Sequence, residues 1–299
     1  MQQTRKQQKG KIMNRNQALE FVESIDDLNK IKTLLKKVIL TDSQGWQTNA
    51  QKLLSFIDKD FNAPIAFTIF AAKGNKKLPF YAFSSLALAD CPGAGSCKSF
   101  CYSLKAWRYP AAFFRQLQNS LLLRNKPQVI KNAFYAIPQN KTLRLFVDGD
   151  FNSVETLRFF MDLCKARKDL NVYGYSKSWK LFLELNATGY DWPSNYLTNA
   201  SSGSKHAKTG LETAFLKLPI VRGAFDAVKV DKRFIASKAY QDKTRPLSKD
   251  YRASVAKILK QDGKRGFACP GNCGNCLPKG RHACGSKDFK GITVAIGIH

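Results

Sequence analysis

The chain reads LRLFVDGDFNSVETLRFFMDLCKARKDLNVYGYSKS over residues 143–178, and this stretch decides the fold. Leu143 to Val147 is a short apolar run typical of a strand, and Val172 to Tyr175 is a second one. Between them, apolar residues recur at helical spacing from Val154 to Arg167. A strand, a helix and a strand in this order predict two parallel strands joined by a crossover helix.

The same alternation extends over most of the chain. We expect strands at residues 80–88, 143–147, 172–175, 196–199, 224–230 and 292–298, and helices at 110–123, 129–134, 154–167, 179–185 and 248–260. This pattern predicts an α/β core over residues 65–299, with a mostly parallel sheet that is open or curled into a partial (β/α) barrel.

A different pattern precedes this core. Residues 1–15 are basic and polar and predict a disordered arm. Apolar residues at helical spacing then predict a helical extension over residues 16–64, broken near residues 24–27 and followed by a short helix at 53–61.

Seven of the eight cysteines fall into two clusters. They are the front cluster, Cys91, Cys97 and Cys101, and the back cluster, Cys269, Cys273, Cys276 and Cys284. Dense cysteines in turns rich in Pro, Gly and Asn are typical of zinc or iron–sulfur sites. Disulfides or unliganded thiols are the alternative, but the sequence shows no secretory signal or membrane span, which favours a cytoplasmic protein with reduced thiols.

The two clusters predict different kinds of site. The back cluster has the spacing C-x3-C-x2-C with Cys284 as a fourth thiol, which indicates a closed centre, and His282 competes as fourth ligand. The front cluster, C-x5-C-x3-C, has three thiols and leaves a position free, unless a distant residue such as His206 completes it. The expected cofactors are one or two iron–sulfur clusters of the 4Fe–4S type, with zinc as the alternative. Cys164, alone on a predicted helix, is expected to be a buried apolar residue.

Polar side chains lie on or directly after several predicted strands. They are Asp148, Asp150, Tyr175, Lys177 and Asn199. Active sites of parallel α/β folds lie beyond the carboxyl ends of the strands, so we expect these residues in one pocket beside the front cluster. Asp148, Asp150 and Asn199 would contact a cofactor, and Tyr175 and Lys177 would donate protons or bind phosphate, with Asp148 and Asp150 also as catalytic candidates. Plain turns and outward-facing polar residues are the structural alternative.

The net charge of +27, from 49 Lys and Arg against 22 Asp and Glu, favours a polyanionic partner. Residues 98–126 contain no acid and interleave basic and aromatic residues. The candidate contacts are Lys98, Lys105, Trp107, Arg108, Arg115 and Arg124. Cations with aromatic rings are typical of single-stranded nucleic-acid binding, although the rings could equally belong to the core.

The front cysteine motif, Val147-Asp148-Gly149-Asp150-Phe151, Tyr173-Gly174-Tyr175-Ser176-Lys177-Ser178 and the back cysteines resemble the gene product 88 family of phages and plasmids over residues 65–299. This resemblance implies a protein of mobile elements. A more distant similarity, in placement alone, is to radical S-adenosylmethionine enzymes, whose partial barrel carries a cysteine loop after its first strand. It implies S-adenosylmethionine as a further cofactor, although the usual loop spacing there is C-x3-C-x2-C.

Two functions follow from these expectations. In the first, the chain is an enzyme with an open front cluster that acts on nucleic acid. In the second, it is a nucleic-acid-binding protein of mobile-element replication or transfer, in which both metal sites are structural.

Overall fold

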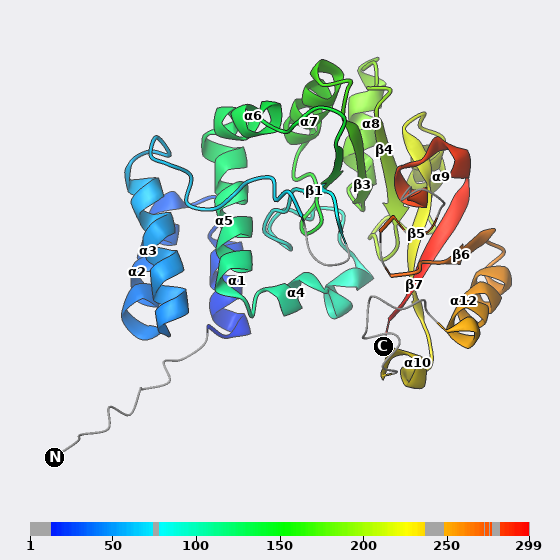
Figure 1. The fold of residues 1–299 in the computed structure, drawn as a ribbon, viewed down its shortest axis with the longest axis horizontal. Coiled ribbons are helices and arrows are strands. Elements are labelled where there is room, and N and C mark those ends of the chain that lie inside the picture. Colours follow the sequence, from blue (N-terminus) through cyan, green and yellow to red (C-terminus); the bar gives the residue numbers. More distant parts are fainter. Residues whose placement is uncertain are drawn as a thin grey trace.

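The structure, a computed structural model, describes residues 13–73, 78–236, 248–271, 273, 274, 276 and 282–298; most of the predicted basic arm lies outside them. Seven strands form one sheet in the order β1-β2-β3-β4-β5-β7-β6, and each pair of neighbouring strands is parallel (Figure 1). The strands are β1 (Tyr81–Ala82), β2 (Thr142–Leu145), β3 (Asn171–Ser176), β4 (Tyr196–Ser201), β5 (Val221–Lys229), β6 (Gly266–Ala268) and β7 (Ile292–Ile298). The predicted α/β fold with a parallel sheet is therefore confirmed.

Two strands differ from the sequence prediction. Only Tyr81–Ala82 of the predicted strand at residues 80–88 is regular, although Phe83 N still donates to Arg144 O at 3.0 Å and Ser85 N to Asp148 O at 3.0 Å. The chain thus follows β2 without forming a full ladder. β6 was not predicted, because its three residues include a glycine and are too few to show a period.

Helices cover one face of the sheet. Val172 and Tyr196 point to this face and share a hydrophobic core with Phe160, Phe182 and Phe215 of the crossover helices. The helices after the N-terminal extension are α4 (Ser103–Ala106), α5 (Pro110–Asn125), α6 (Pro127–Tyr135), α7 (Val154–Ala166), α8 (Trp179–Ala187), α9 (Gly210–Leu216), α10 (Lys232–Ala236) and α12 (Lys249–Gln261). α12 packs on β6 and β7 through a smaller apolar cluster.

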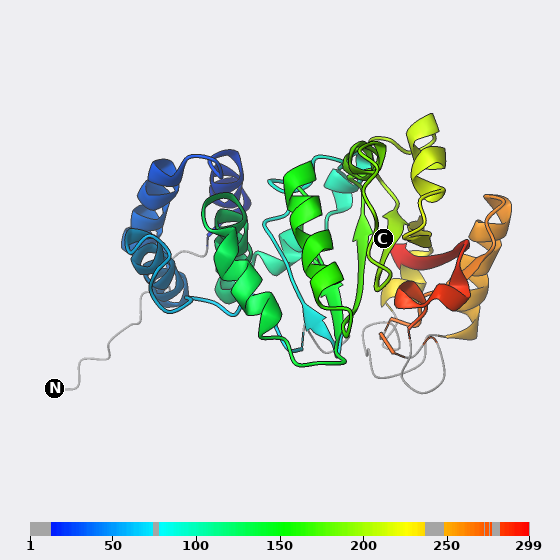
Figure 2. The ribbon, with the colours of Figure 1, turned by 90° about the horizontal axis from the view of Figure 1, so that it is seen from above.

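The opposite face carries a different cover. Tyr173, Leu197 and Val294 alternate with the residues of the first face, and they pack against Ala283 and Cys284 of the 3₁₀-helix η3 (Ala283–Gly285). A second 3₁₀-helix, η4 (Lys287–Phe289), leads from there to β7. Parallel sheets need both faces covered. Here η3 and η4, near the red end of the colour scale in Figure 2, contribute to the second layer.

The N-terminal helices are α1 (Arg15–Glu23), α2 (Leu28–Thr41) and α3 (Gln44–Asp58), and they stand beside α5 (Figure 1). The side chain of Asp27 caps α2 by accepting from Lys30 N at 3.0 Å, which explains the predicted break at residues 24–27. α3 is longer than the helix expected at 53–61. Trp46 packs on Phe113 of α5 with ring centroids 5.9 Å apart, so the helical extension shares its core with the rest of the chain.

Candidate metal centres

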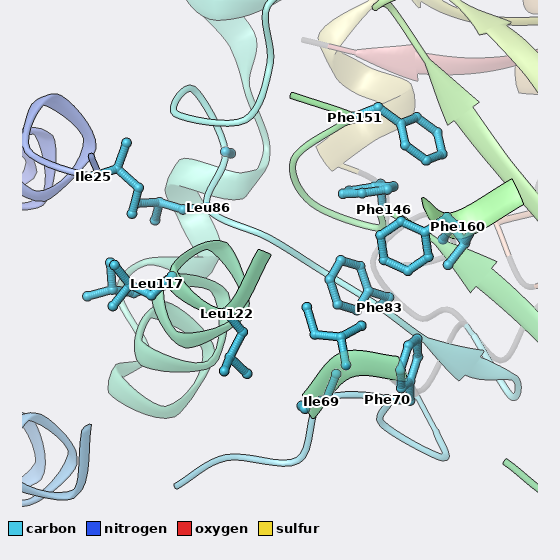
Figure 3. Packing of buried hydrophobic residues seen from close by; sticks show 14 of the residues in the cluster. Ile25, Ile69, Phe70, Phe83, Leu86, Leu117, Leu122, Phe146, Phe151 and Phe160 are labelled. Atoms are coloured by element: carbon cyan, nitrogen blue, oxygen red, sulfur yellow. The ribbon is translucent and has the colours of Figure 1, made fainter. Parts of the chain in front are cut away.

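A buried aromatic cluster anchors the loop that follows β2. Phe146 has a φ of 50°, which ends the strand at Leu145 and turns the chain. Its ring packs against those of Phe83, Phe151 and Phe160, with centroids 5.2, 4.5 and 5.4 Å away (Figure 3). The backbone on both sides of Asp148 and Asp150 is therefore held by packing.

Asp150 is buried and joins the ends of two strands. Its carboxylate accepts from Lys177 N at 2.7 Å, Ser178 N at 3.2 Å and Ser176 Oγ at 2.9 Å, and from Phe151 N at 2.8 Å. Burial raises the pKa of Asp150, and these donors, together with the Lys177 charge, oppose the rise. The carboxylate thus fixes the turn between β3 and α8.

Asp148 holds the segment that follows the front cysteines. Its two oxygens accept from Ser103 Oγ at 2.6 Å and from Ser84 Oγ at 3.1 Å. Tyr102 adds a bond from its hydroxyl to the carbonyl of Val147. Asp148 therefore fastens α4, and with it Cys101, to the end of β2.

The front cysteine loop is seated on the turns that follow β3 and β4. Gly95 N donates to Gly203 O at 2.9 Å, and Lys205 N donates to Gly93 O at 2.9 Å. Gly203 has a φ of +80°, and a Cβ there would lie 2.7 Å from the Cβ of Cys97. The front cluster thus lies at the carboxyl ends of the strands.

The front thiols are half-buried and share a cationic neighbour. Burial, followed by the charge of Asp150, raises the pKa of Cys91 well above its usual value, and Lys177 opposes this rise. Burial also raises the pKa of Cys97, again opposed by Lys177. Lys177 Nζ donates to Ser201 Oγ at 2.6 Å. Thiols in this setting stay protonated unless a metal binds them as thiolates.

The back cluster lies over the middle of the sheet rather than at its edge. Asn199 Nδ2 donates to the carbonyls of Gly174 and Cys284, both at 2.9 Å. Tyr173 OH lies 4.0 Å from Cys273 Sγ. Burial raises the pKa of Cys284 to about 11, although a hydrogen bond from Tyr175 lowers it in part. Burial also raises the pKa of Cys269 to about 12.

Sequence reasoning missed two arginines of the back cluster. Arg144 of β2 lies over the ring of Tyr175, with its guanidinium carbon 4.4 Å from the ring centroid. Arg222 of β5 donates from Nε to Asn199 Oδ1 at 2.7 Å. The sequence does contain a signal for such residues, because a charged residue inside an apolar strand, as in Leu143-Arg144-Leu145, indicates a buried charge.

Among the described residues, the back thiols lie near one another without forming a site for a single ion. In the described part of the chain, no three Cys, His, Asp or Glu side chains converge closely enough to bind a single ion. The back thiols nevertheless influence one another electrostatically, as expected of side chains around a shared space. In an iron–sulfur cluster each thiolate binds a different iron, so its sulfurs surround a larger body.

His282 is a further candidate ligand. Both of its ring nitrogens are buried and make no hydrogen bond within the described residues. The ring lies between Phe80 and Tyr173, at centroid distances of 4.8 and 4.4 Å. Burial and the charge of Arg144 lower its pKa to about 4, which keeps the imidazole in the neutral form that binds metals.

The predicted pocket residues divide between two places. Asp148, Asp150 and Lys177 lie at the front cluster, whereas Tyr175 and Asn199 lie under the back cluster. The amide of Asn199 is taken up by protein groups. His206 is half-buried in the loop after β4, and Cys164 is fully buried in α7, as expected of an apolar residue.

The predicted nucleic-acid residues also divide. Lys98, Lys105 and Arg108 are exposed. Trp107 is 4% exposed and bonds Gln116 through its indole, so its ring is not available for stacking. Arg124 is paired with Asp90 and Asp26, at 2.7 and 2.6 Å, and Arg115 is half-buried. The rings of Tyr109, Tyr102 and Phe100 in the same segment are exposed.

The comparisons with known proteins give one match. A family model described as Gene product 88 matches residues 47–285, which is well over half of the chain, and confirms that resemblance. No curated protein and no solved structure matches the chain. No helix among the described residues is long and apolar enough to cross a membrane.

Proposed function

Because the chain belongs to the gene product 88 family and gathers its cysteines at one sheet, we propose that it is an iron–sulfur protein that acts on nucleic acid. The front cluster is the reactive site and the back cluster is a closed, structural or electron-transfer site. Zinc in both sites is the alternative occupant.

One observation carries this proposal. The front loop is docked on the carboxyl ends of β3 and β4, where parallel α/β proteins have their active sites, and its three thiols are half-buried. The described residues place no fourth cysteine in this loop. Three protein ligands would leave a position for an external molecule.

The residues around the front site have separable tasks. Asp150 and Asp148 position the loops, since their oxygens already accept hydrogen bonds from the protein. Lys177 supplies a positive charge beside Cys91 and Cys97. A bound iron–sulfur cluster would supply one-electron chemistry. S-adenosylmethionine is the external ligand that we propose for the free position, by the placement of the cysteine loop in a partial barrel.

The charge at the rim supports a phosphate-bearing substrate. Lys98, Lys105 and Arg108 are exposed after the front cysteines, and the loop after β4 adds Lys205 and Lys208. The β4 loop is hydrogen-bonded to the front loop, so these cations belong to one side of the molecule. Phosphates are attracted to such a surface without sequence preference.

The test is metal analysis of protein purified without oxygen. We expect iron and sulfide in the wild type, loss of about half of each in Cys97→Ala and in Cys273→Ser, and no loss in the control Cys164→Ala. S-adenosylmethionine should change the spectrum of the wild type and of Cys273→Ser but not of Cys97→Ala. Protein without iron in every preparation would overturn the iron–sulfur assignment, and zinc in its place would support structural sites.

The second candidate is a non-catalytic nucleic-acid-binding protein of mobile-element replication or transfer. It is favoured by the back cluster, because Ala283 and Cys284 pack on Tyr173, Leu197 and Val294 of the sheet, as expected of a segment with a structural task. Spectra that do not respond to S-adenosylmethionine, together with salt-dependent nucleic-acid binding, would select it.

A further inference from the structure

Two arginines lie beside the back cluster without an ion pair to any described carboxylate; Arg222 is buried and Arg144 is half-buried. Arg222 is 1% exposed and donates to the carbonyls of Phe289, Ile292 and Ala224, at 3.1, 2.6 and 3.0 Å, and to the Asn199 amide oxygen. Arg144 stacks on Tyr175, and its Nε is buried without a hydrogen bond. All these acceptors are uncharged.

No carboxylate among the described residues lies within ion-pair distance of either guanidinium. Asp148 acts on Arg144 electrostatically, but its oxygens are bonded to Ser84 and Ser103. A buried cation is costly unless a negative charge lies near it. The sheet therefore holds two guanidinium groups that form no direct ion pair with a described carboxylate.

The groups that can become anionic here are the back thiols. Arg144 stacks on Tyr175, and Tyr175 packs in the same apolar cluster as Cys269, Cys276 and Cys284. Burial lowers the pKa of Arg222, and Cys284 and Cys276 oppose this. The geometry agrees, because Arg222 and the Cys284 carbonyl bind the same amide, that of Asn199.

We propose that Arg144 and Arg222 are the counter-ions of a metal centre held by the four back cysteines as thiolates. A divalent metal core with four thiolates carries two formal negative charges, which two guanidinium groups balance. Disulfides in the same place would leave both cations unbalanced. The inference rests on the proposed function and deepens it, since it assigns the charge of the back centre.

Arg144 is the arginine whose charge can be removed to change the stability and the reduction potential of this centre. Arg222 is fixed by hydrogen bonds to β4, β5 and the segment before β7, so its loss would disturb the sheet itself. Arg144 makes a ring contact and leaves its Nε free, so it can change with less damage. Removing its charge should destabilise the anionic centre and disfavour its more negative, reduced form.

The test compares Arg144→Met, Arg144→Lys and Arg158→Met in the Cys97→Ala background, in which the front cluster is lost. Arg158 is the matched control, because its guanidinium lies 5.2 Å from the ring centroid of Tyr190 and is exposed on α7. We expect Arg144→Met to release metal to a chelator about tenfold faster and, with iron, to lower the midpoint potential by about 60 mV. Arg144→Lys should keep most of both properties.

The outcomes separate the two proposals. Protein that binds no metal in any variant would overturn the proposed function and this inference with it. Protein that binds metal but in which Arg144→Met behaves as Arg158→Met would overturn the inference and leave the function standing. Where Arg144→Met fails to fold, Arg144→Gln, with an uncharged amide, replaces it under the same two criteria.

Discussion

Asp150 shows how one buried carboxylate can hold the loops of a candidate site in place. In Asp150→Asn, an amide N–H₂ would face backbone donors such as Lys177 N and Ser178 N, which now bind carboxylate oxygen. We expect a loss of about 2–4 kcal/mol in the free energy of unfolding, measured with urea. Alkylation of Cys91 should also become faster, because the charge of Asp150 raises the pKa of this thiol and the amide carries no charge.

Asp162→Asn is the matched control for this change. Asp162 is exposed on α7 and accepts from Tyr190 OH at 2.5 Å. It should cost under about 1 kcal/mol, because solvent replaces the lost acceptor. Equal losses in the two variants would contradict the organising role of Asp150.

A change at Gly203 tests whether the front loop must lie close to the turn after β4. Gly203→Ala places a Cβ 2.7 Å from the Cβ of Cys97 at a φ of +80°, whereas Gly189 has a φ of +73° and nothing within 4 Å. Both changes to alanine carry backbone strain of about 1 kcal/mol. We expect Gly203→Ala alone to lower metal content at the front site after anaerobic reconstitution, and equal retention in both variants would refute the docking role.

At the scale of elements, the segment with the back cysteines serves as a layer of the fold. Removing the metal that we propose for this segment should loosen η3 from Tyr173, Leu197 and Val294 and expose their apolar face. We expect Cys273→Ser to lower the melting temperature and to bind a fluorescent apolar dye, whereas Cys284→Ala should do so more strongly, because Cys284 is buried. A melting temperature equal to that of the wild type would show that the layer holds without metal.

The same scale shows what the sequence could predict. Period and composition located β2, β3, β4 and β7 closely, because buried strands are runs of apolar residues. They could not show that Tyr175 and Asn199 face the back cluster, since this depends on a C-terminal segment folding over strands that precede it by almost a hundred residues. Trp107 was ambiguous for a similar reason, because an aromatic residue among lysines can lie on the surface or at a helix interface. In the structure it lies at the interface with α5, where its indole donates to Gln116.

At the scale of the whole molecule, the charge predicts sequence-tolerant binding of nucleic acid. We expect affinity for single strands to fall steeply with salt, because each neutralised phosphate releases a counter-ion. Charge reversal of Lys98, Lys105 and Arg108 to Glu should flatten this dependence in filter-binding or anisotropy measurements. The matched control reverses Lys30, Lys36 and Lys52, which are exposed on α2 and α3. Equal effects of the two triple variants would mean that nucleic acid responds to the net charge of the protein and not to the surface that carries Lys98, Lys105 and Arg108.

The strand order has a consequence for how the protein is made. β6 pairs with β7, which comes from the ribosome later, and β7 lies between β6 and β5. During translation, β6 has no partner strand until β7 has emerged. A metal or cluster proposed for the back cysteines would therefore reach its final setting only on a chain whose synthesis has passed β7.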